Sequence, residues 1–126
     1  MNRTRISFLV AAVLLFTSVA CQAGKIVCKS GSEGGSADAG RITLAWDSNT
    51  ETYLEGYRIY YGTSPGKHRD CVDVGKPTEF SPGTTQYVLT GLNRGTTYHI
   101  AVRAYSNYGG YFLQSELSNE VSAVAR

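Results

Sequence analysis

The chain lacks net charge beyond its N-terminus. Its 126 residues carry 12 Lys and Arg against 10 Asp and Glu, and the two excess positive charges correspond to Arg3 and Arg5. From residue 21 onward, 4 Lys and 6 Arg balance 10 acidic residues. A neutral chain has no electrostatic field that steers nucleic acid or anionic lipid toward it. We therefore expect no nucleic-acid partner.

Catalytic motifs are also missing. The sequence contains no Gly-x-Ser-x-Gly and no glycine-rich phosphate loop that ends in Lys. His68 falls in a polar loop and His99 at an outward strand position, where a solvated histidine is the ordinary interpretation. No nucleophile, base or metal set emerges, so we expect no enzymatic activity and no cofactor.

A calcium loop is suggested only superficially by Asp47-Ser-Asn-Thr-Glu51. Its sixth position is Thr52 rather than Gly, and its twelfth is Arg58 rather than a bidentate Glu. We expect Asp47 and Asn49 to cap a turn through local hydrogen bonds instead, and we expect no metal site.

A long hydrophobic run is absent too. The apolar stretch Phe8–Phe16 has nine residues, whereas a membrane-spanning helix needs about 20. It follows Arg3 and Arg5 and precedes small residues, which is the pattern of a secretory signal peptide over residues 1–20. We therefore expect the protein to be exported.

The end of this leader allows two processing routes. Ser18-Val-Ala-Cys21 resembles the lipobox of bacterial lipoproteins, apart from Ser18 where an aliphatic residue is usual. We favour this route, in which Cys21 is acylated and anchors the protein to a membrane. Gln22 after the cysteine favours the outer membrane, by the same resemblance. The alternative is cleavage after Ala23, which gives a soluble protein of the periplasm or cell surface.

Cysteine is scarce, with three residues in the chain. Cys21 carries the lipid in the first processing route and is cleaved off in the second, so Cys28 and Cys71 remain as a pair. An oxidising compartment predicts a disulfide between them that closes a loop of 43 residues. Two free thiols or a metal site are the alternatives, and the lack of a Cys-x-x-Cys pair disfavours zinc.

What is plentiful is tyrosine, with 9 residues, and glycine, with 14. Residues 21–40 contain a Gly/Ser-rich stretch that is typical of a flexible tether. From Arg41 apolar and polar residues alternate with period 2, and turn residues interrupt the alternation. The alternating segments are residues 41–46, 57–61, 87–89, 98–104 and 121–123. This pattern predicts an all-β antiparallel sandwich over residues 41–126.

The same segments resemble a bacterial fibronectin type III domain. The resemblance is carried by Thr43–Glu51, Leu54–Gly62, Leu89–Tyr98 and Ser118–Val121. It implies a seven-stranded, immunoglobulin-like sandwich with Trp46 and Tyr57 as core neighbours. Leu92 and Tyr98 would form a tyrosine corner, in which a Tyr hydroxyl binds nearby backbone. In such domains a first strand, called strand A, closely precedes the strand that begins here at Arg41. The stretch directly before Arg41 is Gly/Ser-rich instead, so Lys25–Cys28 is the candidate for strand A.

Binding in such sandwiches is carried by the loops at their ends. Residues 106–115 place Tyr108, Tyr111, Phe112 and Leu113 around a Gly-Gly pair, and Tyr53 lies in a loop expected at the same end. Aromatic side chains are enriched in binding hot spots. We take Tyr108, Tyr111, Phe112 and Tyr53 as candidate binding residues. The alternative is that Phe112 and Leu113 fold back to cover the open end of the core.

These observations predict a non-catalytic binding or assembly module of the bacterial cell envelope. Its partner would be an envelope protein or a polysaccharide, and a lipid anchor would hold it to the membrane. The alternative is a structural spacer subunit without a ligand of its own. The fold resemblance does not separate the two, because this sandwich carries many unrelated functions.

Overall fold

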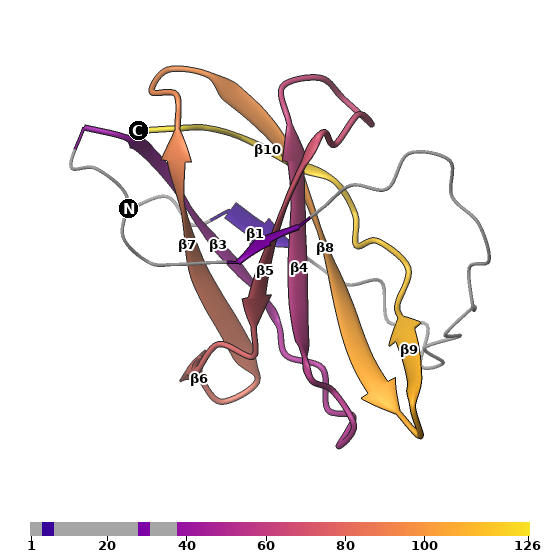
Figure 1. The fold of residues 1–126 in the computed structure, drawn as a ribbon. Coiled ribbons are helices and arrows are strands. Elements are labelled where there is room, and N and C mark those ends of the chain that lie inside the picture. Colours follow the sequence, from indigo (N-terminus) through magenta and orange to yellow (C-terminus); the bar gives the residue numbers. More distant parts are fainter. Residues whose placement is uncertain (1–3, 7–27, 31–37) are drawn as a thin grey trace.

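Ten strands lie in the part of the chain that the computed structural model describes, residues 4–6, 28–30 and 38–126, and the long ones follow the alternation of apolar and polar residues. Figure 1 shows their arrangement. The strands are β1 (Thr4–Ile6), β2 (Lys29–Ser30), β3 (Gly40–Asp47), β4 (Gly56–Gly62), β5 (Asp70–Gly75), β6 (Glu79–Ser81), β7 (Thr84–Leu92), β8 (Thr97–Tyr108), β9 (Tyr111–Gln114) and β10 (Val121–Val124).

The strands form two sheets, which confirms the predicted all-β sandwich. One sheet has the order β1-β3-β7-β6, and the other has the order β10-β8-β4-β5-β2, with β9 paired to β8. The long strands pair antiparallel, whereas β1 pairs parallel with β3 and β2 pairs parallel with β5. The expected seven strands become ten because short edge pairings and a hairpin add strands of two to four residues.

The core lies between the sheets and is built from the inward positions of both. Trp46 of β3 and Tyr57 of β4 are each 1% exposed, and their rings meet edge to face at 5.2 Å. Leu44, Ile59 and Val102 are fully buried around them. Burying each side chain of this size contributes about 1.5–3 kcal/mol to stability. The inward apolar residues of the alternating strands therefore hold the two sheets together.

At each end of this core a tyrosine hydroxyl accepts a hydrogen bond from the backbone. The hydroxyl of Tyr98 accepts a hydrogen bond of 3.0 Å from the Asn93 backbone, next to the buried Leu92, as expected for a tyrosine corner. At the other end the Tyr57 hydroxyl accepts a hydrogen bond of 2.9 Å from the Asn49 backbone. Asn49 is therefore held by a core tyrosine across the turn, a contact that its local sequence does not show.

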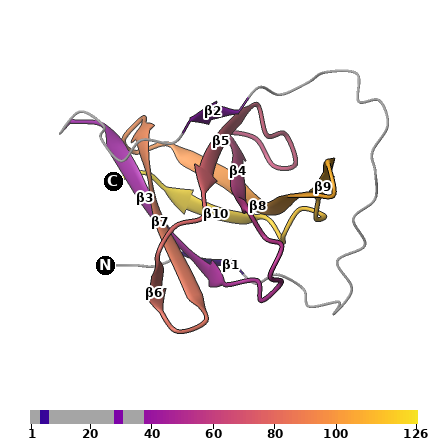
Figure 2. The ribbon, with the colours of Figure 1, turned by 60° about the horizontal axis from the view of Figure 1, so that its bottom comes forward.

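The predicted disulfide joins Cys28 to Cys71, across a sequence separation of 43 residues. Cys71 lies in β5, so the bridge places β2 at the outer edge of the six-stranded sheet (Figure 2). The expected strand A over Lys25–Cys28 falls mostly outside the described residues, and Cys28 itself lies outside any strand. The position beside β3 is taken by β1.

Most of the N-terminal predictions fall outside the described residues. Of the expected signal peptide, the structure describes only Thr4–Ile6, and the expected lipid site Cys21 lies beyond the described ranges. Among the described residues, no helix is both long and apolar enough to span a membrane.

Removing the disulfide is expected to lower the stability of the domain. For a closed loop of 43 residues, the chain-entropy model gives a loss of about 3–4 kcal/mol. We expect this loss in the Cys28→Ser/Cys71→Ser variant, measured by urea unfolding at equilibrium. Reduced wild-type protein provides the matched control and should unfold at the same urea concentration as the variant. A loss below about 1 kcal/mol would show that the bridge does not constrain the unfolded chain.

Candidate binding surface at one end of the sandwich

The predicted loop at residues 106–113 is a β-hairpin. Strand β8 continues to Tyr108, which pairs directly with Tyr111 of β9. The two residues between them, Gly109 and Gly110, have φ angles of 62° and 83°. A two-residue turn with positive φ at both positions has the twist that adjacent strands require, and glycine adopts it without strain. The Gly-Gly pair thus closes a tight turn between two paired strands, which corrects the expectation that residues 106–115 form an end loop.

Phe112 lies on the outer face of the six-stranded sheet. Its ring packs against the ring of Tyr105 at 5.7 Å, and the Arg58 guanidinium lies over it at 4.8 Å. Leu113 has the opposite orientation by strand alternation and is half-buried opposite Ser106. The alternative that Phe112 covers the end of the core is therefore wrong, because the register of β9 directs its ring outward.

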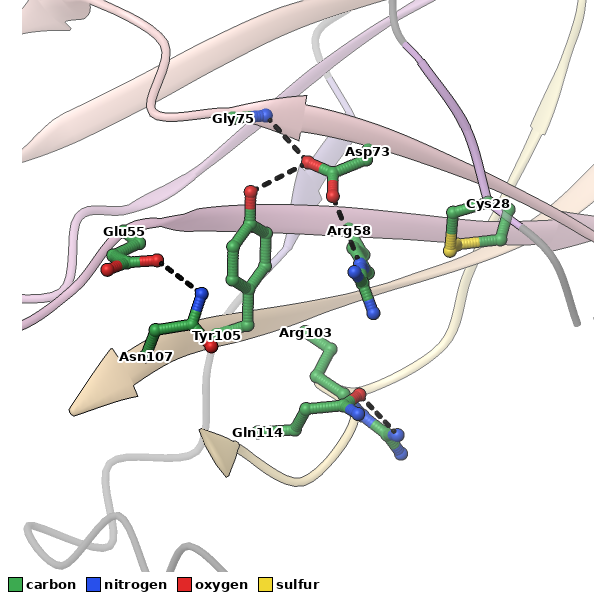
Figure 3. Close-up of polar contacts among 10 residues, drawn as sticks. Cys28, Glu55, Arg58, Asp73, Gly75, Arg103, Tyr105, Asn107 and Gln114 are labelled. Carbon is green, nitrogen blue, oxygen red and sulfur yellow. Dashed lines mark hydrogen bonds and ion pairs between the residues drawn. A yellow bond between two sulfur atoms is a disulfide. The ribbon is translucent and has the colours of Figure 1, made fainter. Parts of the chain in front are cut away.

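Arg58 links this aromatic pair to a carboxylate. It lies 4.9 Å from the centre of the Tyr105 ring, and its Nε is 3.2 Å from Asp73 Oδ2 (Figure 3). Asp73 Oδ1 accepts hydrogen bonds from the Tyr105 hydroxyl at 2.9 Å and from the Gly75 backbone at 3.0 Å. Burial and the bond to Asp73 raise the pKa of Tyr105 to about 12. Tyr105 therefore remains a hydrogen-bond donor at neutral pH, and the Phe112 ring rests on a fixed support.

A second set of contacts braces the hairpin against the sheet. Arg103 lies 5.5 Å from the centre of the Tyr60 ring and donates a hydrogen bond of 3.2 Å to Gln114 of β9. Asn107 of β8 donates a hydrogen bond of 3.1 Å to Glu55 (Figure 3). Arg103 and Asn107 lie four residues apart and so on the same, outer face of β8. Both contacts therefore hold the hairpin to the sheet on that face.

Tyr53 belongs to the same end, as predicted from its loop. The Ser106 hydroxyl donates a hydrogen bond to the Tyr53 carbonyl, and the Glu55 backbone donates one of 3.0 Å to the Tyr105 carbonyl. The turn between β6 and β7 completes this end, because Thr84 pairs with Asp47 at the end of β3. In Figure 1 all three segments lie at the bottom of the sandwich, with the β6–β7 turn and the β8–β9 hairpin at opposite sides of this end.

Four exposed aromatic side chains lie on the segments of this end, and we call them the end patch: Tyr53, Phe80, Tyr111 and Phe112. Their exposed fractions are 38%, 54%, 74% and 42%. They are all the exposed aromatic residues among the side chains that the structure describes, and that of Tyr108 is not among these. Sequence analysis missed Phe80. The available signal was a single aromatic residue between Pro77 and Pro82, where no strand alternation accounts for it.

The opposite end brings both histidines to one carboxylate. His68 Nε2 lies 2.8 Å from Glu120 Oε1, and His99 Nδ1 lies 3.7 Å from Glu120 Oε2. The Gly66 backbone also donates a hydrogen bond of 2.9 Å to Glu120. These contacts join the β4–β5 turn to the segment before β10. The two histidines were not predicted to share a partner, because His68 lies 52 positions before Glu120 in the chain.

Within residues 4–6, 28–30 and 38–126 no group of three His, Cys, Asp or Glu residues is arranged to hold a metal ion. The hydrogen bond from the Gly66 backbone, followed by the contact with His68, lowers the pKa of Glu120. The ionised carboxylate of Glu120 therefore holds the β4–β5 turn to the segment before β10.

The contacts of Glu120 predict that the protein loses stability against unfolding in acid. Because the folded state lowers the pKa of Glu120 below its reference value of 4.5, its contribution to stability is complete above that value and is lost as the pH falls through the folded pKa. Between about pH 5 and pH 3, we expect wild-type protein to lose more stability than Glu120→Gln. Urea unfolding across this range measures the difference. Glu116→Gln, on the same segment, is the matched control. Parallel curves for wild type and Glu120→Gln would contradict the assignment.

The family comparison agrees with this geometry. Residues 36–121 match the model of the fibronectin type III domain. No curated protein and no solved structure matches the chain. The match covers most of the chain, including every strand from β3 to β9, and the two-sheet arrangement is the one this fold requires. The chain therefore belongs to the fibronectin type III domain family.

Proposed function

We propose that this protein is a non-catalytic binding or assembly module of a bacterial cell envelope, and that it recognises a protein or polysaccharide partner through the end patch. The observation that carries the proposal is that the exposed aromatic side chains which the structure describes, Tyr53, Phe80, Tyr111 and Phe112, all belong to segments at one end of the sandwich. Residues 36–121 match a fibronectin type III domain, which is typically a non-catalytic binding or spacer module.

The end patch has the physical properties of a binding surface. Tyrosine and phenylalanine supply a large contact area with few rotatable bonds, so little entropy is lost when they are immobilised. The hairpin that carries Tyr111 and Phe112 is already braced by Arg58 and Arg103. A surface ordered before binding loses less freedom on association than a flexible loop.

Export is supported by the covalent structure. The Cys28–Cys71 disulfide is typical of proteins that fold in an oxidising compartment, outside the cytosol. We propose that residues 1–20 direct export and are then removed. We further propose that acylated Cys21 anchors the protein to a membrane, with residues up to Cys28 as the connection.

The intact mass of protein recovered from its native envelope tests the anchor. We expect an acylated chain that begins at Cys21, and a gain of two hydrogens on reduction because one disulfide opens. A Cys21→Ser variant serves as the control and should appear without lipid. If the mass corresponds to an unmodified chain that begins at Gly24, the lipid anchor is wrong and the protein is a soluble exported form.

Substitution of the aromatic residues tests the binding role. We expect Tyr53→Ser/Tyr111→Ser/Phe112→Ser to lower partner recovery about tenfold or more, because truncated hot-spot aromatics dominate binding energy. The measurement is a pull-down from envelope extract, together with cosedimentation on insoluble cell-wall polysaccharide. Val124→Ser is the matched control, since Val124 is 46% exposed at the far end of β10.

Two outcomes would contradict this role. If the triple variant retains every partner of wild type, binding does not use the end patch. If wild-type protein recovers no partner that the control beads lack, the spacer subunit is the better description.

A further inference from the structure

The outer face of the six-stranded sheet carries two arginines directly opposite each other. Arg58 of β4 and Arg103 of β8 are partners in the strand register. Their chain neighbours Ile59 and Val102 are fully buried, so strand alternation directs both arginines away from the core. Like charges directly opposite each other across two strands are destabilising. This part of the face is therefore stabilised by any negative charge that comes close to it.

One such charge comes from Asp73, and it is committed to Arg58. Asp73 Oδ2 lies 3.2 Å from Arg58 Nε, while Oδ1 accepts hydrogen bonds from Tyr105 and from the Gly75 backbone. In Figure 3 Arg103 extends toward Gln114, on the side away from Asp73. Among the residues that the structure describes, no carboxylate forms an ion pair with Arg103.

The contacts of Arg103 are all with neutral groups. It donates a hydrogen bond of 3.2 Å to the Gln114 side chain, and it lies 5.5 Å from the centre of the Tyr60 ring. Its Nε is buried and has no hydrogen-bond partner. A buried donor on a charged group is costly when it is left without a partner. Arg103 is thus a positioned cation that lacks the carboxylate which a guanidinium binds best.

The remaining charged groups on this face lie too far along β8 to replace that carboxylate. Glu55 is bonded to Asn107, four residues beyond Arg103. His99 lies four residues before Arg103 and meets Glu120. At 3.3 Å per strand residue, each separation is about 13 Å, whereas charges are screened over about 8 Å at physiological ionic strength.

The surroundings of Arg103 indicate the kind of ligand. Strands β4 and β8 lie inside the sheet and are paired on both sides, so an extended peptide finds no free backbone there. Side chains alone are offered, and they include the Tyr60 ring beside Arg103 and the Phe112 ring over Arg58. Aromatic rings are flat apolar surfaces that lose little entropy on binding. A sugar ring with a carboxylate has both complements, an apolar C–H face and a negative charge.

We propose that the outer face of the six-stranded sheet binds an acidic polysaccharide, with Arg103 paired to a uronate carboxylate and the rings of Tyr60 and Phe112 against the sugar rings. The proposal rests on the proposed function, because it names the class of polysaccharide partner. The site shares Phe112 with the end patch, whereas Arg103 lies outside the end patch.

Polygalacturonate is the probe for this site, and its fully methyl-esterified form is the matched control. The two polymers have the same sugar rings, but the ester lacks the negative charge. Isothermal titration of the full chain recovered from its envelope measures both affinities. We expect wild-type protein to bind polygalacturonate about tenfold or more tightly than the ester, because the ester cannot form the charge-assisted hydrogen bonds to Arg103.

Two variants test the role of Arg103. Arg103→Gln removes the cation, and Gln114→Glu places a carboxylate of the protein itself where Arg103 already donates a hydrogen bond. We expect either change to weaken polygalacturonate binding about tenfold or more, because the ion pair with the ligand is lost. Gln114→Glu should unfold at no lower urea concentration than wild type, which separates lost binding from lost folding. Arg41→Gln alters the net charge equally, in the other sheet, and should bind as wild type does.

Several results would overturn the proposal. These are equal binding of the methyl ester, wild-type affinity in folded Gln114→Glu, and a loss in Arg41→Gln as large as that in Arg103→Gln. Equal affinity for poly-glutamate would identify an acidic peptide as the ligand and overturn the polysaccharide class. If polygalacturonate does not bind but the end patch still recovers a protein from envelope extract, this inference fails and the proposed function stands.

Discussion

The contact between Trp46 and Tyr57 is the interaction on which the rest of the structure depends. It joins the two sheets, and both rings are almost completely buried. Because these residues face inward, strand alternation directs their neighbours Arg58 and Asp47 outward. The Tyr57 hydroxyl also holds Asn49 in the turn that leads to Tyr53. The core therefore positions the end of the sandwich as well as stabilising it, and a change in register would move both together.

Rigidity at the end patch comes from charge paired with aromatic rings rather than from apolar burial. Arg58 is shared between Asp73, Tyr105 and Phe112, so one guanidinium fixes residues from β5, β8 and β9. Each such contact at a partly exposed site is worth only about 0.5–1 kcal/mol. Their effect is on geometry, because the hairpin has no core of its own. The Gly109-Gly110 turn supplies the twist, and the outer-face contacts supply the orientation.

The disulfide has a consequence for the opposite sheet. It joins Cys28 to β5, next to the parallel pairing of β2 with β5, whereas β1 lies beside β3 in the other sheet. The two described segments that precede β3 therefore lie at the edges of different sheets.

The sequence by itself determined the all-β class, the core pair Trp46 and Tyr57, the disulfide and the end that carries Tyr53, Tyr111 and Phe112. The all-β class and the disulfide follow from local alternation, turn residues and cysteine number, which act over short distances along the chain. The core pair and the shared end are what the resemblance to a fibronectin type III domain implied. Only the tertiary structure decided that residues 108–111 form a tight hairpin, that Phe112 lies on Arg58, and that Glu120 gathers His68 and His99. It also placed β1 and β2 on opposite sheets. Such contacts join residues far apart in sequence, and their partners are chosen by strand register and sheet order, which no local pattern encodes.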